Sequence, residues 1–305
     1  TRLQGDWSSD VCSSDLGIIV LPSGTAEPGE DAAVVLGVGE YVLDIAVTPD
    51  RGYALSVRGV AREVSIAFQG RFLDPVERPD NLPAPNPGIS PAECASEDLS
   101  GCPFFTLRTL SGFDPSKQTP QWMVNRLRDS GMRSVSLAVD VTNYVMLEMG
   151  QPLHAFDLDT LQGPVRAGRA VDGETLETID HVVRTLNPDD LTIRDDRGPI
   201  GLAGTMGGLD TEITETTTNI ALEAAFFEAT TVARMGRRHR LSSEASRRFE
   251  RGIDRTLAPV ASARAAELLI NLGGGVYAGM TAVEAPLHRT DRKSTRLNSS
   301  HLVIS

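Results

Sequence analysis

One stretch, residues 139–157, constrains what this chain can fold into more than any other part of the sequence. Residues 142–149 place apolar side chains on several sides of a predicted helix, and the Gly-Gln-Pro sequence that follows ends it. Since a helix that is apolar on several sides is normally buried, Asn143 inside it and His154 after it are expected to share the interior. A buried polar group needs a partner or a function, so the stretch predicts both a core helix and a candidate site.

Hydrophobic periodicity and turn residues predict a mixture of helices and strands in the rest of the chain. The expected helices cover residues 56–69 with Ser56 as N-cap, 119–130 with Thr119 as N-cap, 142–149 with Asp140 or Thr142 as N-cap, and parts of 230–272. The expected strands cover residues 17–21, 41–47, 134–139, 164–170, 175–179, 182–186 and 191–195, with His181 at a tight turn. Together they predict an α+β fold with layered antiparallel sheets and flanking helices.

Three other segments bear on where chemistry is expected. Residues 74–103 are rich in proline and predict an extended linker or surface loop without chemistry. Residues 202–208 are dense in glycine, which indicates either a turn with unusual dihedral angles or a backbone surface close to a ligand. They lack the spacing of a dinucleotide-binding or Walker loop. Within residues 219–227, Glu223 is either a solvated acid at the edge of an element or a buried hydrogen-bond acceptor.

The composition excludes several functional classes. The 305 residues include 41 acidic and 29 basic ones, a net charge of −12, which argues against a protein that coats nucleic acid through bulk charge. Cys12, Cys94 and Cys102 are odd in number and lack CxxC spacing, so we expect neither a metal site nor a disulfide framework, and we expect a cytoplasmic location. No apolar run is long enough to span a bilayer, and no signal peptide is apparent, so we expect no membrane contact.

A basic segment, residues 234–255, stands out against this acidic background. Ion pairs along a helix face explain part of it but leave the cluster of Arg237, Arg238 and Arg240 without partners. Because arginine binds phosphate in a bidentate manner, we expect these three side chains to contact nucleic-acid phosphates.

Both ends of the chain differ in character from its body. Residues 1–16 and 292–305 have no periodic pattern and are expected to be non-native translated read-through, with natural disordered tails as the alternative. If they are non-native, Cys12 and His301 have no functional role.

Five sequence blocks occur in an order typical of one family. They are VTPDRGYALSVRGVAREVS (residues 47–65), GMRSVSLAVDVTNYVMLEMGQPLHAFD (131–157), LAGTMGG (202–208), ALEAAFF (221–227) and LSSEASRRFERGID (241–254). In these blocks the chain resembles the β subunit of bacterial phenylalanyl-tRNA synthetase. The resemblance implies that residues 17–40 end an OB-fold-like tRNA-binding module, 41–255 form the editing domain, and 256–291 form an exit helix and the start of a connection to further modules.

The resemblance also implies a function. The whole enzyme would join phenylalanine to tRNA-Phe using ATP and Mg²⁺, with the synthetic site in the α subunit of an α2β2 assembly. The fragment would need no cofactor of its own and would hydrolyse tyrosine from wrongly charged tRNA-Phe. Two alternatives stay open: a non-catalytic module that docks tRNA and the α subunit, and a structural domain that does not function after truncation.

The family's editing pocket implies roles for particular residues of this chain. Glu223 would accept the phenolic hydroxyl of tyrosine, because a site built to bond a hydroxyl rejects an analogue that lacks it. His154 would act as a general base or position water and substrate. Asn143 belongs to the same pocket. Ala245 would leave room for the ring, and Ser243 would be a hydrogen-bonding group rather than a nucleophile.

Three further residues complete the predicted site. Arg133 would orient Glu223 or hold a phosphate, with a plain ion pair as the alternative. Backbone N–H groups around Gly207 and Gly208 would hold the ester or the terminal nucleotide. With the basic cluster near residue 238, these residues make up the expected binding surface for tRNA.

Overall fold

The computed structural model describes residues 23–35, 41–77 and 80–286. The chain divides into two compact units, Thr1–Ala46 and Val47–Ser305. The described part of the first unit includes one short helix, α1 (Ala32–Val35). The strand predicted at 17–21 and both chain ends lie outside the described residues. The strand predicted at 41–47 is wrong, because these residues have no regular structure: alternation produces a strand only where a second strand completes its hydrogen bonds.

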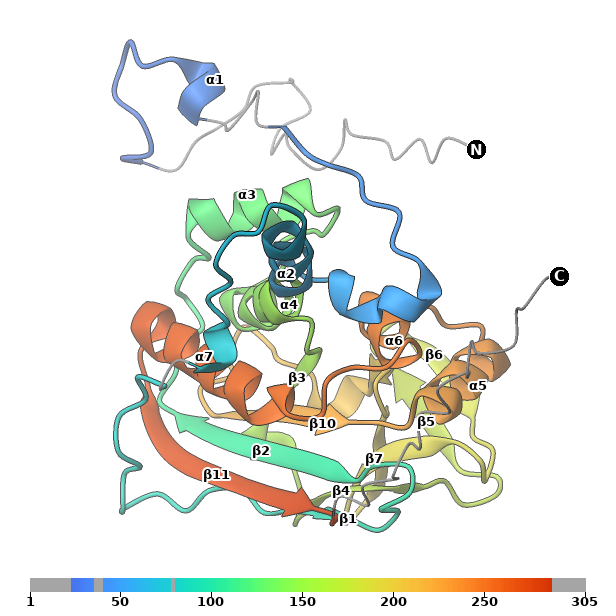
Figure 1. The fold of residues 1–305 in the computed structure, drawn as a ribbon. Helices are drawn as coiled ribbons and strands as arrows, with labels where there is room; N and C mark the ends of the chain where they lie inside the picture. The colour runs from blue at the N-terminus through green and yellow to red at the C-terminus, as the bar shows by residue number, and fades with distance from the viewer. Residues whose placement is uncertain (1–22, 36–40, 78–79, 287–305) are drawn as a thin grey trace, which may run out of the picture. The chain divides into compact units, whose positions relative to one another are not determined.

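The second unit is built in layers around a four-stranded antiparallel sheet in the order β11-β2-β10-β3 (Figure 1). Its strands are β2 (Phe104–Ser111), β3 (Leu153–Asp157), β10 (Ile220–Phe226) and β11 (Val276–Glu284). Helices cover one face of this sheet, and a second sheet packs on the other face. The α+β prediction with layered sheets and flanking helices is confirmed.

The second sheet has five strands in the order β1-β4-β7-β8-β9, antiparallel except for the parallel pair β1 and β4. Its strands are β1 (Cys94–Ser96), β4 (Val165–Arg169), β7 (Leu191–Asp195), β8 (Gly198–Leu202) and β9 (Met206–Gly207). The predicted linker 74–103 is therefore incorrect in part, since β1 belongs to this sheet. A separate hairpin pairs β5 (Thr175–Thr178) with β6 (Val182–Thr185), and His181 at its turn has φ 56°, the left-handed conformation.

Helices form in all four predicted regions, three of them within residues 229–273, but the predicted starts at 119 and 142 are wrong. The helices are α2 (Val57–Ala67), α3 (Gln121–Asp129), α4 (Leu137–Met149), α5 (Ala229–His239), α6 (Glu244–Phe249) and α7 (Leu257–Gly273). Short 3-10 turns are η1 (Pro49–Ala54), η2 (Pro75–Glu77), η3 (Leu158–Thr160) and η4 (Leu209–Thr211). The predicted cap Ser56 does accept a hydrogen bond from the backbone N–H of Gly59.

The start of α4 corrects three predictions. Ser136 is its N-cap, so residues 134–139 form no strand and neither Asp140 nor Thr142 is the cap. Asp140 is instead fully buried and accepts hydrogen bonds from the Thr119 and Ser134 hydroxyls, both at 2.5 Å. Thr119 is therefore not the cap of α3. A carboxylate that several donors satisfy ties the segments on either side of it together.

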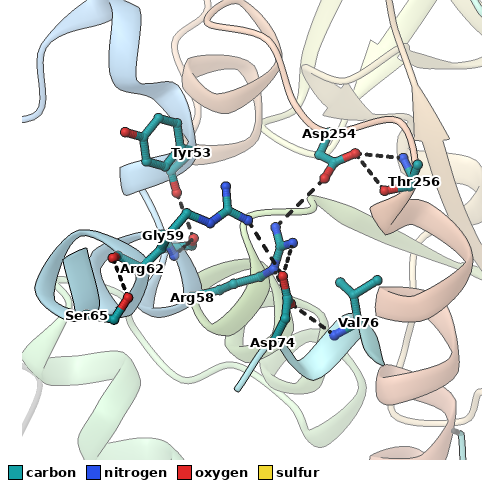
Figure 2. Close-up of polar contacts among 10 residues, drawn as sticks. Tyr53, Arg58, Gly59, Arg62, Ser65, Asp74, Val76, Asp254 and Thr256 are labelled. Atoms are coloured by element: carbon teal, nitrogen blue, oxygen red, sulfur yellow. Dashed lines mark hydrogen bonds and ion pairs between the residues drawn. The ribbon is translucent and has the colours of Figure 1, made fainter. Parts of the chain in front are cut away.

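Two buried arginines order the segment 47–77 and its contact with the rest of the second unit: Arg58 within the segment and Arg248 of α6. The Arg58 guanidinium makes two hydrogen bonds to the Asp74 carboxylate, at 2.7 and 2.8 Å, and lies 3.9 Å from Asp254 (Figure 2). Arg248 of α6 donates from Nε and Nη2 to the backbone carbonyl of Leu55, at 3.1 and 2.8 Å. Bidentate pairs of this kind fix orientation as well as distance.

Strand alternation decides which side chains of β10 face which layer. Ile220 and Leu222 belong to the core beneath α4 and α7, whereas Ala221 and Ala225 belong to the core shared with the five-stranded sheet. Successive side chains of a strand point to opposite faces. Glu223 consequently points away from the helices, toward the layer that contains β8 and β9.

Candidate functional site

The centre of the site is a pair of polar side chains on neighbouring strands. Glu223 of β10 is the direct antiparallel partner of His154 of β3. Directly opposed residues in such a pair project from the same face of the sheet with their Cβ atoms close together. This register, which no sequence pattern predicted, places the Glu223 carboxyl group and the His154 imidazole side by side on one face of the sheet.

A tight glycine hairpin between β8 and β9 covers this pair. A Cβ atom built on Gly207 would lie 2.5 Å from Cε1 of His154, so a side chain there would collide with the imidazole. Gly204 at the turn has φ +65°, in the left-handed region that glycine adopts easily. The segment is therefore a turn with an unusual dihedral angle, as one alternative predicted, and its backbone lies against His154. That this backbone lies close to a ligand stays a prediction.

Helix α6 supplies another wall. Its N-cap Ser243 accepts a hydrogen bond from the backbone N–H of Ser246 at 3.0 Å and donates to the Thr205 carbonyl at 2.9 Å. The Ser243 hydroxyl therefore donates its proton to the glycine hairpin and attaches α6 to it. Ser243 is a hydrogen-bonding group, as predicted, and its partners are other parts of the protein. Ala245 follows in the first turn and faces the same space.

These elements line a cavity of about 490 Å³ that is open to solvent. It is lined by side chains or backbone from α4, β3, the β8–β9 hairpin, β10 and α6. Six of the residues expected at the site line it: Asn143, His154, Gly207, Glu223, Ser243 and Ala245. Volumes of this size are typical of small-molecule sites.

Two predicted site residues are elsewhere. Arg133 is exposed, does not line the cavity, and makes no hydrogen bond to Glu223, so the prediction that it orients that carboxyl group is wrong. The Gly208 N–H donates to the Ile200 carbonyl at 2.8 Å. A backbone donor already used in the sheet ladder is not free to hold an ester, so that part of the predicted surface is corrected.

One arginine of the basic cluster has an acidic partner, and two have none among the described residues. Arg238 is ion-paired with the buried Asp190, which also lies 2.7 Å from Nε2 of His239. The expectation that Arg238 lacks a partner is therefore wrong, since a loop distant in sequence provides the acid. Arg237 and Arg240 are exposed and make no ion pair with any described residue. Arg237 donates from Nε to the Ala233 carbonyl at 3.0 Å.

Burial sets the protonation states at the centre. Glu223 is 6% exposed and receives no hydrogen bond from the described residues, and burial raises its pKa to about 8. Burial lowers the pKa of His154 to about 4, and its Nε2 atom is buried without a partner among the described residues. At neutral pH the carboxyl group is therefore largely protonated and the imidazole neutral. An acid that can donate a hydrogen bond stands beside a base that can accept one.

The cavity wall also contains residues that the sequence did not single out. Thr142 and Met146 contribute from α4, and Glu212 contributes from the turn after η4. Helical spacing from Asn143 would have found Met146, three residues later, and Thr142 lies four residues before Met146, because residues three to four apart share a helix face. No local pattern distinguishes Glu212 from the other acids of its loop.

Within residues 23–35, 41–77 and 80–286, no cluster of three or more His, Cys, Asp or Glu side chains is placed to hold a metal ion. None of the helices in those ranges combines the length and apolar character that crossing a membrane requires.

Comparison with known proteins places the chain in a family. Residues 101–274 match the B3/4 domain. The chain is 55% identical over 286 residues to the phenylalanine–tRNA ligase β subunit of Thermobifida fusca, and 53% identical over 274 residues to that of Streptomyces avermitilis. These alignments cover 93% and 88% of this chain but 34% and 32% of the relatives, so the chain spans about a third of their length.

A solved structure is a more distant match. An N-terminal fragment of the phenylalanyl-tRNA synthetase β subunit from Pyrococcus horikoshii is 14% identical, with a TM-score of 0.35, over 64% of this chain and 60% of that one. The domain match and the high identities to bacterial proteins carry the assignment. The chain belongs to the B3/4 domain family, in the form that bacterial phenylalanine–tRNA ligase β subunits carry.

Proposed function

We propose that this domain hydrolyses the ester bond between tyrosine and tRNA-Phe. One observation carries the proposal: Glu223 and His154 are directly opposed in the sheet, on the wall of a cavity of about 490 Å³. Among the described residues, neither the Glu223 carboxyl group nor Nε2 of His154 has a hydrogen-bond partner. Unpartnered buried polar groups are costly unless a ligand satisfies them.

Glu223 discriminates tyrosine from phenylalanine. A phenolic hydroxyl that enters the cavity exchanges hydrogen bonds with its carboxyl group, whereas a phenyl ring would leave that group unpaired. Ala245 leaves room for the ring beside it. Rejection of an analogue that lacks the bonded hydroxyl reaches about 10⁴-fold or more in sites of this design.

His154 positions the attacking water in the hydrolytic step. Its neutral imidazole accepts a hydrogen bond from the water at Nε2. Because its pKa is low, it is a weak general base at neutral pH. The Asn143 side-chain amide donates to the ester carbonyl oxygen as negative charge develops there. The water oxygen bonds to the carbonyl carbon, the bond from that carbon to the ribose oxygen breaks, one water proton passes to the ribose oxygen, and the acid product releases the other to solvent.

The wider setting is part of the same proposal. In an intact α2β2 assembly the domain would act on tRNA-Phe charged by the α subunit, whose synthetic reaction uses ATP and Mg²⁺. The exposed arginines Arg237 and Arg240 are the remaining candidates for contact with tRNA phosphates.

Deacylation assays on matched substrates test the proposal. The 305-residue chain, alone and within a reconstituted full-length α–β enzyme, should hydrolyse Tyr-tRNA-Phe at least about 100-fold faster than Phe-tRNA-Phe, as the hydroxyl contact requires. Equal hydrolysis of both substrates would contradict the specificity. Binding of tRNA without any hydrolysis by the full-length enzyme would replace the proposal with a non-catalytic docking module.

A further inference from the structure

The ionisable side chains on the cavity wall are acids and one buried histidine. The described residues that line the cavity include the acids Glu212, Glu223 and Glu244, and none of these described residues is lysine or arginine. His154, the remaining basic side chain there, is neutral at neutral pH because burial lowers its pKa. A cavity wall that offers a carboxyl group and no cationic side chain favours a cationic ligand over an anionic one.

Two of the three acids add no uncompensated negative charge to the wall. The Glu244 carboxylate, in the first turn of α6, is ion-paired with Arg247 at 2.6 Å and with Arg248 at 2.8 Å. Glu223 is buried and largely protonated at neutral pH. Glu212 is half-buried, and its carboxyl group makes no hydrogen bond or ion pair with any described residue, although its backbone N–H donates to the Leu209 carbonyl at 3.3 Å. It is therefore the acid of the wall that remains to bind a cation.

A second observation independently points to a polar ligand. The Glu223 side chain is more than nine-tenths buried and lines the cavity without a hydrogen-bond partner from the described residues. Leaving such a group unsatisfied costs about 1–3 kcal/mol, so the cavity is suited to an occupant with its own polar groups.

We infer that the cavity is built for an aromatic ligand that carries an ammonium group and no free carboxylate, and that Glu212 binds the ammonium. The inference rests on the proposed function and names its substrate class more narrowly: an aminoacyl ester has this charge pattern, whereas the free amino acid adds a carboxylate for which the wall offers no basic side chain. Hydrolysis creates that carboxylate inside the cavity, so the same charges promote product release.

Binding measurements without any hydrolysis test this inference. At pH 6.5, below the usual pKa of an α-amino group, tyrosinamide and tyrosine both carry the ammonium, and only tyrosine carries the carboxylate. Titration calorimetry on the chain should give a Kd for tyrosinamide at least about tenfold below that for tyrosine, the size of one charged contact. Equal or tighter binding of tyrosine would overturn the inference.

The variant Glu212→Gln tests whether this residue binds the ammonium group. It should raise the Kd for tyrosinamide about tenfold. The Kd for 3-(4-hydroxyphenyl)propionamide, which lacks the amine, should stay within about twofold of the wild-type value, so that the comparison isolates the ammonium contact. Glu215→Gln, which removes the same charge from an exposed position outside the wall, should leave both ligands within about twofold. An unchanged Kd for tyrosinamide in Glu212→Gln would overturn the assignment.

These outcomes separate the inference from the proposed function. If the charge preference is found but Tyr-tRNA-Phe is not hydrolysed, the proposed activity fails while the ligand class stands. If the wild-type chain hydrolyses Tyr-tRNA-Phe and Glu212→Gln leaves KM unchanged, the activity stands and the ammonium contact fails.

Discussion

At the scale of single residues, the site depends on one close approach and on the buried acid Glu223. The Cα atom of Gly207 faces the His154 ring so closely that no other residue fits without moving the imidazole. Residue types in the sequence pointed to His154, Glu223 and the glycines. The sequence did not predict that Arg133 would lie outside the cavity, because exposure depends on packing from segments far along the chain.

Gly207→Ala should impair the site more than the fold. The added methyl displaces the imidazole from the position that holds water, so we expect Tyr-tRNA-Phe hydrolysis to fall at least about tenfold while overpacking costs about 1–3 kcal/mol of unfolding free energy. Single-turnover deacylation and urea unfolding measure the two effects. Gly70→Ala is the matched control, since the nearest atom to a Cβ there is 4.0 Å away. Equal activity of both variants would contradict the close contact.

The pKa of Glu223 predicts a dependence of stability on pH. Because burial raises this pKa from 4.5 to about 8, the folded state binds the proton more tightly, and the resulting stability is fully present below pH 4.5 and is lost as pH rises through 8. Urea unfolding should show wild type losing about 2 kcal/mol relative to Glu223→Gln between pH 5.5 and 7.5. The lowered pKa of His154 acts oppositely, between pH 6.5 and 4, and cancels in this comparison. Parallel pH profiles would refute the burial of an unpaired acid.

At the scale of elements, caps and helix ends were predictable where one candidate stood alone. Ser56 and Gly150 act as expected, with Gly150 at φ 89° ending α4. The start of α4 was not predictable in this way, since several cap-type residues occur within a few positions and tertiary hydrogen bonds to Asp140 select among them. The register of β3 against β10, which creates the site, comes from sheet packing and has no local signal.

The attachment of helix α6 to the rest of the protein should depend on its buried Arg248. Arg248 is 3% exposed and joins the Leu55 carbonyl to Glu244, so Arg248→Ala leaves buried groups unpaired and should cost about 3 kcal/mol in urea unfolding. Arg247→Ala removes an exposed arginine from the same helix and should cost at most about 0.5 kcal/mol. Equal losses from the two variants would show that Arg248 does not anchor α6.

At the scale of the whole molecule, the layers were predictable and the pairing of distant segments was not. Alternation and helical periodicity in the sequence were sufficient to predict α+β layers. The order of strands brings β11 beside β2 and sets Asp190 against Arg238 across nearly fifty residues of sequence. Such contacts follow from topology, which local periodicity does not contain. The basic cluster consequently lost one of its three candidate contacts.

The remaining basic contacts make a prediction about tRNA. Arg237→Ala and Arg240→Ala should each weaken tRNA-Phe binding and reduce the slope of log K against log salt by about 0.7–0.9, the effect of one phosphate contact. Filter binding across a salt series measures this. Arg71→Ala, a change at another exposed arginine, should leave the slope unchanged. Unaltered slopes in both cluster variants would remove these residues from the tRNA surface.

The central claim is that the Glu223 carboxyl group reads the phenolic hydroxyl, and one measurement tests it most directly. The ratio of hydrolysis rates for Tyr-tRNA-Phe and Phe-tRNA-Phe should fall from at least about 100 in the wild-type chain to below about 5 in Glu223→Ala, because the discriminating hydrogen bond is gone. A ratio that remains near the wild-type value in a folded Glu223→Ala variant would contradict the claim.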